Sequence, residues 1–172
     1  MRGFSSMLVN GHILIDCGHT VLDVMKRCKV DLAGITDLLL THTHWDHFHQ
    51  DTLLALADAK DVKLGPLRLW AYPEALISAP KSNRIEKCPV EIGETFNIHG
   101  FGITGLESNH LDSSLKEKSL YYLIEGATKT LLYASDGSWL LKSRQYLQKK
   151  RLDTLIWEAT IGERAGDYRT FE

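Results

Sequence analysis

The chain has 172 residues, of which 44% are hydrophobic and 24% are charged, and a formal net charge of −2. These values predict one globular domain over residues 1–172. The net charge gives no sign of a strongly basic surface, so it does not indicate nucleic acid as a partner. No apolar run approaches membrane-spanning length and no secretory signal opens the sequence, so we expect no membrane association. The three cysteines are odd in number and unpatterned, which favours reduced thiols and a cytoplasmic location.

The first half alternates short strands and helices. Asn10-Gly11 separates two apolar runs and favours a tight hairpin turn, because both residues tolerate positive φ angles. Apolar residues at helical spacing over residues 20–30 predict a helix with Thr20 as its N-cap. The elements expected in this half are strands over residues 7–9, 13–15, 37–41 and 67–72, and helices over residues 20–30, 51–59 and 73–76.

The second half is expected to begin with strands and to end with a helix and a strand. Hairpins that lead into alternating strands and helices in each half predict an α/β protein, an αββα four-layer sandwich rather than a doubly wound parallel sheet. The expected elements are the hairpins 94–98/101–104 and 120–124/130–134, an amphipathic helix over 139–150 and a final buried strand over 152–157.

A cluster of metal-binding residue types follows the apolar residues 38–40. The run 41–47 has the pattern H-x-H-x-D-H, with four potential ligands, His42, His44, Asp46 and His47. At the end of a strand these side chains enter a loop and can converge on a cation, whereas within a strand they would alternate between its faces. Imidazole and carboxylate together suit zinc or a similar divalent metal. A histidine-rich polar turn is the alternative, and it does not explain the position directly after a buried strand.

Asp16 and Asp136 follow expected strands, and His110 lies between the two expected hairpins. Read alone, Asp16 could be a turn residue, His110 a packed or surface residue, and Asp136 a turn residue or a helix cap. The remaining histidines lie in turns or beside the motif, and we expect them not to be ligands: His12, His19, His49 and His99.

The H-x-H-x-D-H motif after a short apolar strand resembles the signature of the metallo-β-lactamase fold superfamily of metallohydrolases. Asp16, His110 and Asp136 match, in order, the family's supporting aspartate, its later histidine and the aspartate that bridges two metals. The resemblance covers about residues 5–160 and implies an αββα sandwich with one or two metals at its open edge. In this family a last histidine lies near the C-terminus, and no histidine follows His110 here. The short ends and this gap predict a chain that is incomplete at both termini.

The resemblance implies two metal positions. His42, His44 and His110 would hold the first cation, and the second would be held by Asp46, His47 and Asp136, with Asp46 also the candidate catalytic residue. Two cations about 3.5–4 Å apart can share a hydroxide, which then acts as the nucleophile of a hydrolase. We expect zinc, with Mn²⁺ or Fe²⁺ as other metals that suit the site, in one or two positions.

The substrate prediction follows from the branch that the chain resembles, the phosphodiesterases that include phosphoribosyl cyclic phosphodiesterase and ribonuclease Z. The segment 155–160 resembles a ribonuclease Z motif in which a histidine precedes Glu-Ala-Thr, but Trp157 occupies that position and cannot titrate. The same segment also fits a plain core strand. Without a positive stripe or a long insertion, a small phosphodiester is favoured over a large RNA. The cysteines, the lack of an export signal and the presence of Asp46 disfavour β-lactam hydrolysis.

Two alternatives remain open at the level of sequence. The chain could be a thioester or lactone hydrolase on the same scaffold, as in glyoxalase II-like and lactonase-like relatives. It could also be a non-catalytic metal-binding fragment, because one ligand of the second position is missing. The sequence makes no prediction about the oligomeric state.

Overall fold

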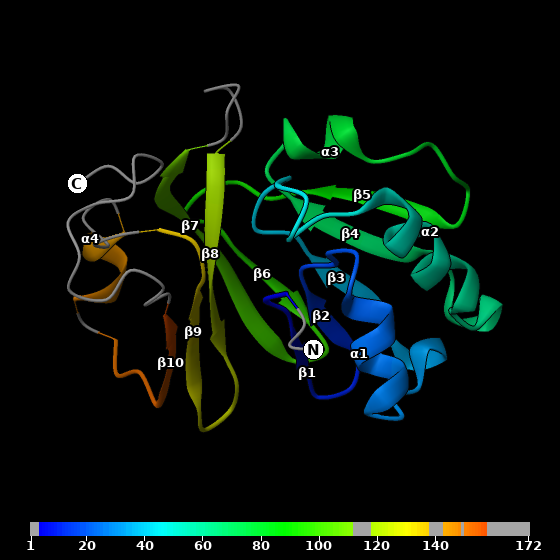
Figure 1. Cartoon of the computed structure of the whole chain (residues 1–172). Coiled ribbons are helices and arrows are strands. Elements are labelled where there is room, and N and C mark those ends of the chain that lie inside the picture. The colour runs from blue at the N-terminus through cyan, green and yellow to red at the C-terminus, as the bar shows by residue number, and fades with distance from the viewer. Residues whose placement is uncertain (1–3, 112–117, 138–142, 149, 158–172) are drawn as a thin grey trace. The chain divides into compact units, whose positions relative to one another are not determined.

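The computed structural model describes residues 4–111, 118–137, 143–148 and 150–157. The chain divides into two compact units, Met1–Pro89 and Val90–Glu172. Each unit is built on a mixed five-stranded sheet, with helices in both units (Figure 1). Two mixed sheets with helices agree with the predicted α/β class.

The sheet of the first unit has the strand order β1-β2-β3-β4-β5. β1 pairs antiparallel with β2, and the other neighbours are parallel. Because β2 and β3 are parallel, their carboxyl ends meet at the same edge of the sheet. The bounds are β1 Met7–Val9, β2 Ile13–Ile15, β3 Asp37–Leu39, β4 Leu67–Ala71 and β5 Ile85–Pro89.

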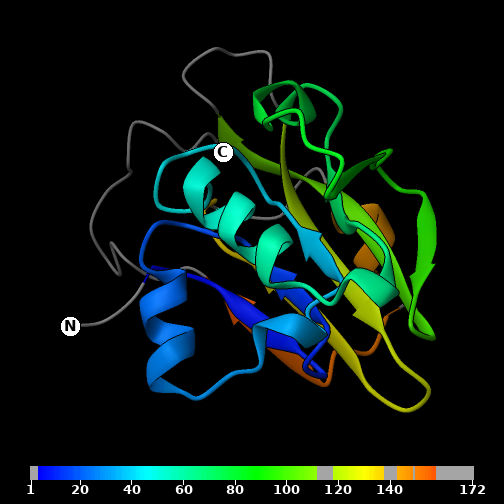
Figure 2. The same ribbon diagram turned by 90° about the vertical axis from the view of Figure 1, so that its right-hand side faces the viewer.

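Helices α1 (Val21–Arg27) and α2 (Gln50–Ala59) lie on one face of this sheet (Figure 2). Their buried side chains pack with Leu14 and Leu38 in one hydrophobic cluster. Leu39 points to the opposite face and is also fully buried. A run buried on both faces is typical of central parallel strands. The unit also contains α3 (Ala75–Ser78) and the 3₁₀ helices η1 (Leu32–Gly34) and η2 (Val62–Leu64).

Most predicted elements of this half are confirmed, with two corrections. Asn10 and Gly11 have φ angles of 50° and 76°, as the predicted hairpin turn requires. Thr20 holds the N-cap position of α1, but its hydroxyl accepts a hydrogen bond from the Phe4 N–H and makes no cap bond. Strand β5 was not predicted from the sequence, because it lies at a sheet edge and its pattern of exposed and buried residues has no regular alternation.

The sheet of the second unit has the strand order β10-β9-β8-β7-β6, with β10 parallel to β9 and the other neighbours antiparallel. Both predicted hairpins are confirmed: β6 pairs with β7, and β8 pairs with β9. The tight β6–β7 turn is formed by His99 and Gly100, which have φ angles of 51° and 83°. The bounds are β6 Thr95–Ile98, β7 Phe101–Leu111, β8 Lys118–Glu125, β9 Thr130–Ala134 and β10 Thr154–Trp157.

The end of the chain corrects the sequence prediction. β10 forms as a strand, but it is an edge strand, and Leu155 is 50% exposed rather than buried. The apolar run was correctly assigned to a strand, whereas its burial depends on neighbours that the run does not reveal. Of the helix predicted over 139–150, the described part contains α4 (Arg144–Leu147). Residues 158–160 of the ribonuclease Z-like segment lie outside the described residues.

Candidate metal centre

The loop 42–47 follows β3 at the carboxyl edge of the first sheet and is held in place by Cys17. The Cys17 N–H donates to the carbonyl of His47 at 2.7 Å, and the Cys17 carbonyl accepts from the N–H of His49 at 3.1 Å. Gly18 lies so close to the loop that a Cβ there would overlap the carbonyl of Asp46. The chain after β2 therefore positions the loop that carries the predicted ligands.

His42 and His44 bring two ring nitrogens together. Nε2 of His42 lies 3.0 Å from Nδ1 of His44. Two nitrogen ligands of one tetrahedral zinc, each at about 2.0–2.1 Å from the metal, would be about 3.3 Å apart. The His42 side chain is buried and the His44 side chain is half-buried. This pair is therefore close to the separation that a shared cation requires.

Asp46 and His47 form a second pair in the same loop. Nε2 of His47 lies 3.7 Å from a carboxylate oxygen of Asp46. The His47 side chain is 2% exposed, whereas the carboxylate side chain of Asp46 is 34% exposed. Asp46 is thus the more accessible member of the pair.

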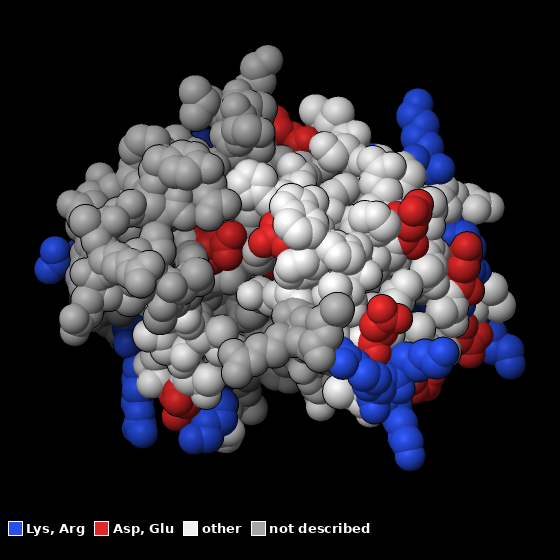
Figure 3. Space-filling view, in the orientation of Figure 1, with Lys and Arg blue, Asp and Glu red and all other residues white. Residues whose placement is uncertain are grey.

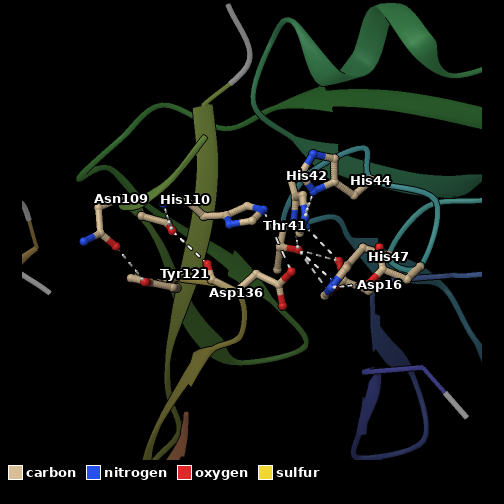
Figure 4. A network of polar contacts seen from close by, with 11 residues as sticks. Asp16, Thr41, His42, His44, His47, Asn109, His110, Tyr121 and Asp136 are labelled. Carbon is tan, nitrogen blue, oxygen red and sulfur yellow. Dashed lines mark hydrogen bonds and ion pairs between the residues drawn. The ribbon is translucent and has the colours of Figure 1, made fainter. Parts of the chain in front are cut away.

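Asp16 supports the loop from below, at the end of β2 (Figure 4). It is fully buried and has a φ angle of 60°. Its carboxylate accepts a hydrogen bond from the Thr41 N–H at 2.8 Å and lies 2.8 Å from Nδ1 of His47. With the hydrogen of His47 on Nδ1, Nε2 is left as a bare acceptor on the side of Asp46.

Burial raises the pKa of Asp16, and the contacts with His47 and Thr41 act in the opposite direction. A cation held by His47 would further favour the charged carboxylate.

In the second unit, Ser108 links the two predicted site residues, His110 and Asp136. Its hydroxyl donates to the backbone carbonyl of Asp136 at 3.1 Å and accepts from the N–H of His110 at 3.0 Å. Nε2 of His110 lies 3.9 Å from a carboxylate oxygen of Asp136. His110 is buried near the end of β7, and Asp136 follows β9 with a φ angle of 34°. Antiparallel pairing of β7–β8 and β8–β9 makes β7 and β9 parallel, so their carboxyl ends lie at one edge.

The other residues that sequence reasoning set aside have different surroundings. His19 is exposed and stacks on Trp45, with ring centroids 5.2 Å apart. His49 is the N-cap residue of α2, and its Nδ1 lies 3.3 Å from the hydroxyl of Thr52. Burial raises the pKa of the Cys17 thiol to about 12, so this thiol is protonated in the metal-free chain.

Each unit therefore brings its own predicted residues together. The first unit holds His42 with His44 and Asp46 with His47, and the second holds His110 with Asp136. Sequence reasoning missed Thr41 and Ser108, whose hydroxyls connect these residues. Their nearness to His42 and His110 in the sequence was the available signal, but a hydroxyl next to a histidine is too common to identify a partner.

The donor set fits a divalent metal. Neutral imidazole and carboxylate are the ligands expected for zinc, and the ring nitrogens of His42 and His44 already converge. Among the described residues no helix is long and apolar enough to span a membrane.

Comparison with known proteins agrees with this geometry. The family described as the β-lactamase superfamily domain matches residues 12–164. No curated protein sequence matches the chain at a significant level. Similarity is therefore found with a family and with solved structures.

Three solved structures illustrate the similarity. The metallo-β-lactamase fold protein YhfI from Bacillus subtilis is 18% identical, with a TM-score of 0.68 over 90% of this chain and 63% of that one. Zn²⁺-bound PqqB from Methylobacterium extorquens is 17% identical, with a TM-score of 0.67 over 89% of this chain and 58% of that one. The short form of human tRNase Z is 15% identical, with a TM-score of 0.66 over 90% of this chain and 70% of that one.

The chain thus spans less than two thirds of the length of YhfI and PqqB. Several metallo-β-lactamases also match, with TM-scores of about 0.6. At these identities the structural matches show the fold, and the family match covers most of the sequence. The chain belongs to the β-lactamase superfamily domain family and has the metallo-β-lactamase fold.

Proposed function

We propose that this chain is a metal-dependent phosphodiesterase, with residues 1–172 acting as one hydrolase domain. His42, His44 and His110 would hold one cation, and the second would be held by Asp46, His47 and Asp136. The observation that carries the proposal is the convergence of ring nitrogens of His42 and His44 in the loop 42–47. The buried carboxylate of Asp16, which contacts His47 in the same loop, supports it.

A bound divalent cation would supply an activated water and would offset negative charge on the substrate oxygen. The chain's own residues hold the geometry. Asp16 orients His47, and Asp46 presents its carboxylate where solvent and substrate can reach it. Ser108 joins the backbones that carry His110 and Asp136, which keeps these two side chains adjacent.

A small phosphodiester is the substrate class that we favour. The similarity to human tRNase Z supports phosphodiester chemistry, whereas the similarity to metallo-β-lactamases supports a lactam. On the face of the first unit that Figure 3 shows, acidic side chains lie beside the basic ones, and no continuous basic stripe crosses this face. A long RNA is bound through such a stripe, so this face favours a small ligand. Zinc is the metal that we expect.

Hydrolysis of bis(p-nitrophenyl) phosphate and of a chromogenic cephalosporin, at matched zinc concentrations, tests the proposal. We expect faster cleavage of the phosphodiester, and a loss of that cleavage in the variant Asp46→Asn. A thioester and a lactone substrate complete the panel. Faster turnover of the cephalosporin, the thioester or the lactone would refute the phosphodiesterase assignment, and zinc-independent turnover would refute the metal.

A further inference from the structure

Thr41 lies at the centre of the buried polar network of the first unit (Figure 4). It is 2% exposed, and its Oγ1 lies 3.0 Å from both carboxylate oxygens of Asp16 and 2.9 Å from Nδ1 of His42. Consecutive residues within a strand point to opposite faces, so Thr41 and His42 can touch only because the chain has left β3. The hydroxyl is therefore placed between a carboxylate and a candidate ligand.

The hydrogens of this network can be assigned from its donors and acceptors. The Thr41 hydroxyl has one hydrogen, and a carboxylate, which only accepts, is a better acceptor than a neutral ring nitrogen. The hydroxyl hydrogen therefore goes to Asp16, and Oγ1 accepts a hydrogen from Nδ1 of His42. A neutral imidazole carries one N–H, so Nε2 of His42 is unprotonated, which is the form that binds a metal, and in the metal-free chain it would accept from Nδ1 of His44 at 3.0 Å.

We propose that Thr41 is a positioning residue that holds His42 with its hydrogen on Nδ1, so that Nε2 is unprotonated and can bind a metal. The Asp16 carboxylate then orients two candidate ligands, His47 by direct contact at 2.8 Å and His42 through Thr41. These histidines belong to different metal positions in the proposed function, so one buried carboxylate serves both positions. Only the metal-binding part of this inference rests on the proposed function, because the hydrogen position on His42 is a property of the metal-free chain.

Variants of Thr41 can separate this positioning role from a purely structural one. The backbone N–H of residue 41 donates to Asp16 at 2.8 Å whatever side chain is present. The variant Thr41→Val keeps this bond and the branched shape but removes both hydroxyl contacts, whereas Thr41→Ser keeps the hydroxyl and loses a methyl group. Thr52→Val is a matched control, because Thr52 is also 2% exposed and its hydroxyl faces His49, outside the proposed ligand set.

Two measurements on these variants test the inference. Long-range proton–nitrogen NMR spectra of the metal-free protein identify which nitrogen of His42 carries the hydrogen. Competition with a chromogenic chelator gives the zinc affinity. We expect Nδ1–H in the parent, in Thr41→Ser and in Thr52→Val, and a shift towards Nε2–H in Thr41→Val. Loss of a hydrogen-bond partner to a metal ligand costs about 10–100-fold in affinity, so only Thr41→Val should bind zinc at least about tenfold more weakly.

Either of two results would overturn the inference. In the first, Thr41→Val keeps both the Nδ1–H form of His42 and the parent zinc affinity. In the second, Thr41→Ser is impaired as strongly as Thr41→Val, which would point to packing by the methyl group. If the parent binds no zinc, the proposed function fails while the NMR comparison still decides the role of Thr41. If Thr41→Val does not fold, Thr41→Ala removes the same hydroxyl and supplies the comparison.

Discussion

Two fully buried aspartates lie at opposite ends of the parallel strands of the first sheet. Asp16 follows β2 at the carboxyl edge, and Asp37 begins β3 at the other edge. Asp37 accepts hydrogen bonds from Nη2 of Arg68 and from Nε1 of Trp70, both at 2.7 Å. Asp16 instead has Thr41 and His47 as partners. Both carboxylates have their buried oxygens satisfied, as burial of a charged group requires.

The two aspartates differ in whether their hydrogen-bond partners can also bind a metal. The guanidinium of Arg68 and the indole N–H of Trp70 have no acceptor nitrogen, so these partners of Asp37 cannot bind a metal. The imidazole of His47 has a second nitrogen, Nε2, which lies 3.7 Å from the Asp46 carboxylate and can act as a metal ligand when Nδ1 donates to Asp16. Asp37 therefore stabilises the sheet, whereas Asp16 also orients the candidate metal centre.

The largest effect is expected from removing a ligand at the carboxyl edge. In His44→Ala, Nδ1 no longer faces Nε2 of His42, and zinc binding should weaken by more than about 100-fold, beyond the loss typical of a partner outside the ligand set. Metal analysis of the purified variant and chelator competition measure the change. His12→Ala is the control, since His12 is exposed and contacts the carbonyl of Gly34. Equal zinc content in His44→Ala and the parent would refute the ligand assignment.

The second prediction separates the two aspartates. Asp16→Asn and Asp37→Asn each replace an acceptor oxygen with an amide N–H₂ opposite groups that donate to the carboxylate, so each should lower the free energy of unfolding by about 2 kcal/mol. Only Asp16→Asn should also weaken zinc binding, by about 10–100-fold, because only Asp16 orients a proposed ligand. Urea unfolding without metal and chelator competition give the two quantities. A similar loss of zinc affinity in Asp37→Asn would mean that zinc affinity depends on the stability of the sheet and not on the orientation of His47 by Asp16.

The third prediction concerns the two metal positions. The second proposed position has Asp46, His47 and Asp136 as ligands, and no histidine follows His110 in this sequence. A missing imidazole is expected to lower affinity by roughly an order of magnitude or more. Isothermal titration of the chelator-treated chain with zinc should therefore resolve two affinities more than about tenfold apart. Two equally tight positions would show that another residue, such as His19 or His49, completes the second one.

Local patterns predicted much of this molecule. The Asn10-Gly11 turn, the buried β3 and helix α2 follow from short-range preferences and periodicity, and the structure contains all three. The H-x-H-x-D-H run could be identified for the same reason, because its residues lie within six positions. The pairing of His42 with His44 is present, while the complete ligand set stays a prediction.

What the sequence did not reveal depends on neighbours that are distant in the chain. The partners of Asp37 become visible only once the parallel register sets Asp37 opposite Arg68. The role of Thr41 requires Asp16, 25 positions earlier, to lie beside it. The edge strand β5 and the exposure of β10 likewise follow from strand order, which hydrophobic periodicity does not encode.

The smallest effect on zinc binding is expected at Gly18, where the chain after Asp16 meets the loop 42–47. A Cβ at this position would overlap the backbone carbonyl of Asp46, so the loop must move in Gly18→Ala. Gly34→Ala is the matched control, because the nearest atom to its Cβ would be 3.8 Å away. We expect Gly18→Ala to cost about 1–3 kcal/mol of stability, as overpacking usually does, and to weaken zinc binding several-fold. Thermal unfolding and chelator competition test both. If Gly18→Ala is destabilised but binds zinc as tightly as the parent, then zinc binding tolerates displacement of the loop. Contacts at the carboxyl edge would then contribute to stability alone, as those of Asp37 do at the other edge.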